Sequence, residues 1–126
     1  MTVSEYLETV KAHLLTNPLV ENFQIVRERI TTNDGHLRVR MTLIKGNLME
    51  FSEYVQRIAG DIQVITYSYH CIDPSGRLIV RWDNTPHFPD LDGFPHHRHI
   101  GYPETVQAGQ PMNIFKVFDE ITQLLK

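Results

Sequence analysis

The fold is decided by a strand–turn–strand segment, residues 62–83, which reads IQVITYSYHCIDPSGRLIVRWD. Its first half is rich in β-branched and aromatic residues, which fit a pleated, half-buried strand. Asp73-Pro74-Ser75-Gly76 is typical of a tight turn, because the Asp side chain bonds to nearby backbone amides and Gly accepts a positive φ. Residues 77–83 then return as a second strand, so the segment predicts an antiparallel pair.

The residues before this segment predict three more strands and a helix. Residues 23–30 are β-like, and the turn Asn33-Asp34-Gly35 joins them to residues 37–43, where apolar and polar side chains alternate. Residues 48–55 predict the next strand. A capping-box sequence from Thr2 to Glu5, followed by apolar residues at helical spacing, predicts a helix over 3–15.

These elements predict one α+β domain over residues 1–126. We expect a five-stranded, mostly antiparallel sheet, with the first helix and a C-terminal helix that opens at Pro111 packed on one of its faces. Residues 84–109 are predicted to form a long His- and Pro-rich loop. Since loops of that length are seldom structureless without a reason, we expect it to be functional.

Charge and cysteine content limit the class of protein. The net charge of −3 argues against a broadly basic surface, although the 12 Lys and Arg residues allow a local cationic patch. Cys71 is the single cysteine, so no intramolecular disulfide forms, and no secretory leader is evident; both favour the cytoplasm. No apolar stretch approaches the about 20 residues that span a bilayer, so no membrane association is expected.

Histidines gather in the predicted loop. Neutral imidazole both binds metals and moves protons near neutral pH, so His87, His96, His97 and His99 predict a site. The first hypothesis is metal-free cleavage of RNA, which needs a base, an acid and a cation but no cofactor. In this hypothesis His87 and His97 transfer protons, and His96 or His99 supports them.

Other residues complete this hypothetical site. Arg81 and Arg98 would hold phosphate, and Asp83 would orient a histidine. Glu53 is the alternative base, because it interrupts an apolar face and burial there would raise its pKa. The candidate substrate-binding residues are Arg98, Asn84, Tyr67 and Tyr69.

Several of these residues also have an ordinary structural explanation. Tyr67 and Tyr69 share a strand face with Cys71, which favours core packing. Glu53 could point to solvent at a strand edge, and Asp83 with Asn84 could simply close a turn.

A metal site is the main alternative. His97 and His99 would lie on one side of an extended segment, and His87 or Asp83 could complete a set for zinc, nickel or another divalent ion. No standard zinc spacing is present. The second hypothesis is therefore a non-catalytic module that binds a metal or a partner, and the third is a metal-dependent phosphoesterase.

Two motifs resemble the TumE-like toxin family of prokaryotic toxin–antitoxin systems. That family has Arg-Tyr-Asp-Asn-Ala-Pro-His followed by Pro-His-His-Lys-His, and this chain has residues 81–87, RWDNTPH, and 95–99, PHHRH. Phe51-Ser52-Glu53 is similar to the family's acidic position, and the resemblance covers roughly residues 20–125. It implies a small cytoplasmic protein, an antitoxin partner that often carries a DNA-binding domain, and a nuclease-like toxin. A homodimer is left open.

Overall fold

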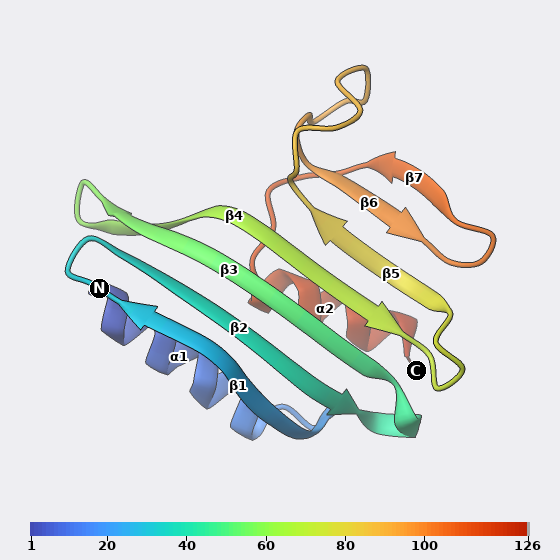
Figure 1. The fold of residues 1–126 in the computed structure, drawn as a ribbon, viewed down its shortest axis with the longest axis horizontal. Helices are drawn as coiled ribbons and strands as arrows, with labels where there is room; N and C mark the ends of the chain where they lie inside the picture. The colour runs from blue at the N-terminus through green and yellow to red at the C-terminus, as the bar shows by residue number, and fades with distance from the viewer. Residues whose placement is uncertain (126) are drawn as a thin grey trace.

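A computed structural model describes residues 1–125, and within them the chain forms one seven-stranded antiparallel sheet and two α-helices. The helices are α1 (Val3–Thr16) and α2 (Ile114–Leu124), and η1 (Ile44–Gly46) is a short 3-10 turn. The strands are β1 (Val20–Ile30), β2 (Asp34–Leu43), β3 (Leu48–Ile58), β4 (Asp61–Ile72), β5 (Leu78–Asp83), β6 (His97–Ile100) and β7 (Thr105–Ala108). They pair in sequence order, and both helices lie on the same side of the sheet (Figure 1).

The expectation of an α+β domain is confirmed, but the five-stranded sheet is wrong. Residues 84–109 are not one irregular loop, because they contain β6 and β7. The sequence did not indicate β6 because this strand has only four residues and no alternation of apolar and polar side chains. It is a strand because it pairs with β5, with Asp83 opposite His97 and Arg81 opposite His99. Such pairing between distant residues leaves no periodic signal in a short polar segment.

Local sequence signals explain both helices. At α1 the Thr2 side chain accepts from the Glu5 amide, and Glu5 accepts from the Thr2 amide, which is the predicted capping box. The second helix starts later than expected, at Ile114, because Asn113 is its N-cap and accepts from the Lys116 amide. Neither helix within residues 1–125 has the length and apolar character needed to cross a membrane.

The sheet has two different faces. The inner face packs against the helices, and the outer face is left uncovered by them (Figure 1). The buried sheet residues of the inner face are Leu37, Val39, Met41, Leu43, Met49, Phe51, Val55, Tyr67, Tyr69, Cys71, Val80 and Trp82. Opposed residues of antiparallel strands share a face. The alternating outer-face residues are therefore Arg38, Arg40, Glu50, Ser52, Ser68, His70, Arg81, Asp83, His97 and His99.

Candidate functional site

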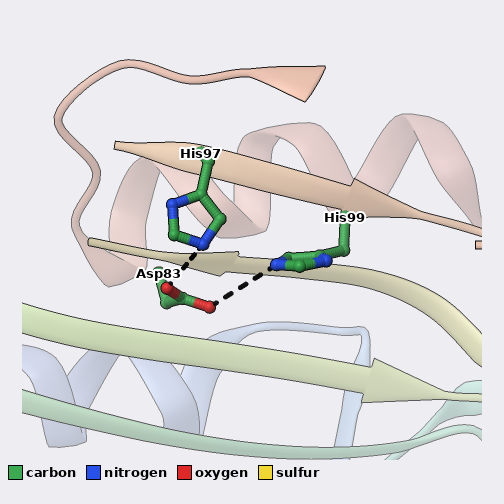
Figure 2. A group of neighbouring side chains, drawn as sticks. All are labelled: Asp83, His97 and His99. Atoms are coloured by element: carbon green, nitrogen blue, oxygen red, sulfur yellow. Dashed lines mark ion pairs between the residues drawn. The ribbon is translucent and has the colours of Figure 1, made fainter. Parts of the chain in front are cut away.

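The pairing of β5 with β6 gathers three ionisable side chains on the outer face. Figure 2 shows His97 and His99 of β6 pointing toward Asp83 at the end of β5. His97 and His99 are two residues apart, so they lie on the same face of an extended strand, as their spacing predicted. We call Asp83, His97 and His99 the Asp/His cluster.

His97 is fixed at both ring nitrogens. Its Nδ1 lies 3.0 Å from the Pro95 carbonyl oxygen, and its Nε2 lies 2.8 Å from Asp83 Oδ1. A carbonyl oxygen only accepts, so Nδ1 carries a hydrogen. The contact with Asp83 then needs a further proton or another cation between Nε2 and the carboxylate. The side chains are only 2% and 6% exposed, so His97 and Asp83 form a buried pair.

His99 is held at one nitrogen and free at the other. Its Nδ1 lies 2.6 Å from Glu104 Oε2, where it donates to the carboxylate. Its Nε2 is 3.9 Å from Asp83 Oδ2, too far for a hydrogen bond. With 14% of its side chain exposed, His99 is the more accessible of the two histidines. Its Nε2 is therefore available to a ligand or a proton.

The cluster borders a pocket that also contains a cation. Arg81 Nε donates to Asp83 Oδ2 over 2.9 Å, and Arg81 Nη1 lies 3.4 Å from His70 Nδ1. Together with the cluster, these residues line a pocket with a cavity volume of about 470 Å³, and His87 and Phe88 lie at its wall. Phe88 is exposed, and its ring centroid is 5.1 Å from that of His97. The pocket could hold a small anionic group against Arg81.

Two glycines explain how the segment after β7 packs against His97. A Cβ at Gly109 would lie 2.7 Å from the His97 backbone nitrogen and 2.9 Å from the His96 carbonyl carbon. A Cβ at Gly93 would lie 2.2 Å from the Gly109 carbonyl oxygen, and Gly93 has a φ of +79°. Since real Cβ atoms do not come so close to backbone, these positions require glycine. The close packing fixes the backbone that carries His97.

Glu53 lies on the inner face, away from the Asp/His cluster. It is 0% exposed and accepts hydrogen bonds from the hydroxyls of Tyr6 and Tyr69, each at 2.6 Å, and from the Ile114 amide at 2.8 Å. Burial raises its pKa, as the sequence suggested, while these donors act in the opposite direction. The alternative of a solvent-facing strand edge is wrong. Glu53 instead joins β3 to α1, β4 and the start of α2.

The predicted tyrosines also belong to the inner face. Tyr69 is buried and bonds to Glu53, and Tyr67 stacks on it with ring centroids 5.3 Å apart. Burial raises the pKa of both phenols. His96 packs on Tyr67, with its Nδ1 2.8 Å from the Tyr67 hydroxyl, and its pKa is lowered by burial and by neighbouring His97. These residues form a packed group rather than part of the pocket.

Arg98 and Asn84 have structural contacts. Arg98 lies opposite Trp82, on the helix side, and pairs with Glu120 of α2 over 3.1 Å. Asn84 donates to the Ile65 carbonyl and accepts from the Tyr67 amide, which ties the end of β5 to β4. Neither side chain lines the pocket described above.

Sequence reasoning missed two residues of the site. Glu104 orients His99, and its signal was the Gly101-Tyr102-Pro103 turn that folds β7 back on β6. His70 faces Arg81 from the neighbouring strand. Burial and Arg81 lower its pKa. The register of β4 on β5 brings it there, and no sequence motif marks it.

The donor set also suits a metal ion. One ligand atom each from Asp83, His97 and His99 lies within 4.8 Å of the others. The outer nitrogens of both histidines are held by acceptors, the Pro95 carbonyl and the Glu104 carboxylate. This is how protein metal sites orient their histidines. His87 lines the same pocket but is outside this set.

Similarity to known proteins agrees with the motifs. The sequence profile of the family described as Toxin TumE matches residues 10–125. No curated protein and no solved structure gives a significant match. The matched region spans nearly the whole chain and includes β5, β6 and both His-containing motifs. The resemblance is thereby confirmed, and the chain belongs to the TumE toxin family.

Proposed function

We propose that this protein is the toxin of a toxin–antitoxin pair and acts as a ribonuclease, with the Asp/His cluster as its reaction centre. The observation that carries the proposal is the free Nε2 of His99, held beside Asp83 and Arg81 at the wall of a pocket. A base, a cation and space for a phosphate are the groups that cleavage of RNA requires.

The chemistry divides among these side chains. His99 Nε2 removes the proton of a ribose 2′-hydroxyl, and the oxygen attacks the adjacent phosphorus. The bond from phosphorus to the 5′-oxygen breaks, and that oxygen takes a proton from His87, which gives a cyclic phosphate and a 5′-hydroxyl end. Arg81 neutralises the phosphate. His97 is too buried to touch RNA, so it positions Asp83 in place of the proton-transfer role that its sequence suggested.

The test is cleavage of single-stranded RNA by the purified protein, with and without EDTA, beside His99→Ala and the control His36→Ala. His36 is on the same face of the sheet, opposite Tyr54 of β3 and outside the pocket. We expect cleavage to survive EDTA. In His99→Ala the rate should fall roughly 10²- to 10⁴-fold, as is typical when a proton-transfer group is lost, and in the control it should be unchanged. Equal cleavage by wild type and His99→Ala would reject this role.

A metal-dependent phosphoesterase is the second candidate, favoured by the orientation of the two Nε2 atoms toward Asp83. A divalent ion such as zinc, bound by Asp83, His97 and His99, would supply an activated water. EDTA would then abolish cleavage and zinc or manganese would restore it. Stoichiometric metal binding without any cleavage would instead favour the non-catalytic binding module.

Partner and location follow from the proposed role. An antitoxin would silence the protein in the cytoplasm by covering the pocket or by pairing with an open sheet edge. β1 offers such an edge, because Ile25, Val26 and Ile30 are exposed along it. Co-purification of the antitoxin encoded beside this chain, with loss of cleavage in the complex, tests this.

A further inference from the structure

The outer face carries a groove that leads to the Asp/His cluster. The groove crosses β2, β3 and β4 and has a cavity volume of about 730 Å³. It shares His70, Ile72 and Arg81 with the smaller pocket beside the cluster. The two depressions therefore adjoin, and a long ligand lying over these shared residues could reach from β2 to His99.

Cations dominate the walls of the groove. Arg38, Arg40 and Arg81 line it, and Glu50 is the carboxylate that faces them. Glu50 lies 2.8 Å from Arg38 Nε and 3.6 Å from an Arg40 Nη, and the hydrogen bond from Arg38 holds its pKa below the ordinary value. Asp83 pairs with Arg81, so Glu50 alone faces both Arg38 and Arg40 and leaves an excess of positive charge on this part of the wall. In a chain of net charge −3, this concentration of positive charge favours a polyanionic ligand.

The floor of the groove suits nucleotide bases. Ser52, Ser68 and His70 lie on it and offer hydrogen-bonding groups. Arg81 donates to His70 Nδ1, so the ring hydrogen is on Nε2. At the far end the exposed Phe88 ring stands beside the His97 and His99 rings. Proteins that hold single strands combine such a cationic groove with rings on which bases stack.

We propose that this groove is the track that holds single-stranded RNA, with phosphates on Arg38 and Arg40 and the cleaved linkage at His99. The proposal rests on the ribonuclease function above. Four strand spacings from β2 to β6 give about 19 Å, the length of about five stacked nucleotides. A single strand fits better than a duplex, because the deep, narrow major groove of A-form RNA hides its base edges from side chains.

The experiment measures binding and cleavage separately. Binding is read by fluorescence polarisation with a labelled RNA of about ten nucleotides whose 2′-oxygens are methylated, in EDTA, so that the strand stays intact. The groove variant is Arg38→Ala/Arg40→Ala. Its charge-matched control is Arg57→Ala/Lys116→Ala. Both residues are exposed: Arg57 is near enough to Glu5 of α1 for its charge to lower the Glu5 pKa, and Lys116 belongs to α2. Glu50→Gln removes the negative charge of the groove.

We expect the groove variant to raise the Kd about tenfold or more and to reduce the salt slope by about 1.4, which is ~0.7 for each lost phosphate contact. The control should leave both values unchanged, and Glu50→Gln should tighten binding. Equal binding by the groove variant and its control would overturn the track, even if unmodified RNA is still cleaved.

A failure of the ribonuclease proposal would give a different result. If the groove variant loses RNA binding but wild type cleaves no RNA under any condition, the surface stands and the ribonuclease proposal fails. If wild type binds no RNA and the groove variant instead loses the antitoxin, the track is overturned and the groove is a protein-binding surface.

Discussion

The two faces of the sheet each bury one carboxylate, and the surroundings of these groups are opposite. Glu53, on the inner face, meets only neutral donors among the contacts within residues 1–125, namely two phenols and a backbone amide. Asp83, on the outer face, meets Arg81 and the imidazoles of His97 and His99. Burial alone therefore does not mark a functional carboxylate.

Access and charge make the difference. Glu53 is sealed between the sheet and the helices, so its hydrogen bonds connect elements and stabilise the fold. Asp83 borders a pocket and is surrounded by groups that can change charge or bind an ion. We infer that Glu53 acts on stability and Asp83 on chemistry, and each prediction below separates these two roles.

The largest effect should come from Asp83→Asn. The amide has the same shape but no negative charge and only one acceptor atom, whereas Asp83 contacts His97 Nε2 at Oδ1 and Arg81 Nε at Oδ2. We expect RNA cleavage to fall about 10³- to 10⁴-fold, as when other histidine-orienting carboxylates are replaced. The measurement is the single-turnover rate, with near-ultraviolet circular dichroism as the check of folding. A rate within about twofold of wild type would show that Asp83 has no role in the chemistry.

Glu53→Ala should have the converse effect. It leaves the Tyr6 and Tyr69 hydroxyls and the Ile114 amide without their acceptor in a buried site. Since an unsatisfied buried group costs about 1–3 kcal/mol, we expect the free energy of unfolding to fall by about 3 kcal/mol or more. Urea unfolding measures it. Cleavage per folded molecule should be unchanged, and a selective loss of cleavage would assign Glu53 to the chemistry.

Gly109→Ala should weaken the site without unfolding the protein. The added Cβ meets the backbone of His96 and His97, so β6 must shift and His97 must move relative to Asp83. We expect cleavage to fall about tenfold or more, since small displacements in an active site are costly. Gly60→Ala is the control, because nothing lies within 4 Å of its added Cβ, although its φ is positive, at +82°. Equal losses in both variants would show that the contact of the Gly109 Cβ with His96 and His97 is not what lowers cleavage.

The smallest effect is a pH dependence of stability that belongs to Glu53. Because burial raises its folded-state pKa, the folded protein keeps this proton to a higher pH than the unfolded chain does. Its contribution to stability is therefore fully present below the ordinary pKa of 4.5 and is lost as pH rises through the folded-state pKa. In urea unfolding, wild type should lose stability relative to Glu53→Gln as the pH rises above the ordinary pKa of 4.5. Parallel curves would mean that the hydrogen-bond donors offset the effect of burial on this pKa, and a gain of stability with pH would mean that they outweigh it.

Sequence predicted the inner half of the molecule better than the site. Alternation in β2, the turn at Asp73 and the capping box at Thr2 are local signals, and each gave an element close to the observed one. The cluster depends on pairing between β5 and β6, across residues 84–96, where no periodicity records the register.

The same limit explains where the structure differs from the expected arrangement. Histidine spacing placed His97 and His99 on one side but within a loop, whereas His97 is buried in β6. It could not separate them from His96, which turns to Tyr67 on the other face. Glu53 was recognised as unusual because it interrupts an apolar face, but its partners come from α1, β4 and α2.

The pairing of the strands in sequence order has a consequence for synthesis. Each strand from β2 onward can dock on the one made just before it, so the sheet can grow as the chain leaves the ribosome. Asp83 emerges with Arg81 but without His97 and His99, which follow only with β6, and Glu104 comes after them. The hydrogen bond from the Ile114 amide to Glu53 likewise forms only after α2 has been made. The Asp/His cluster is therefore complete only once the last strands of the sheet have formed.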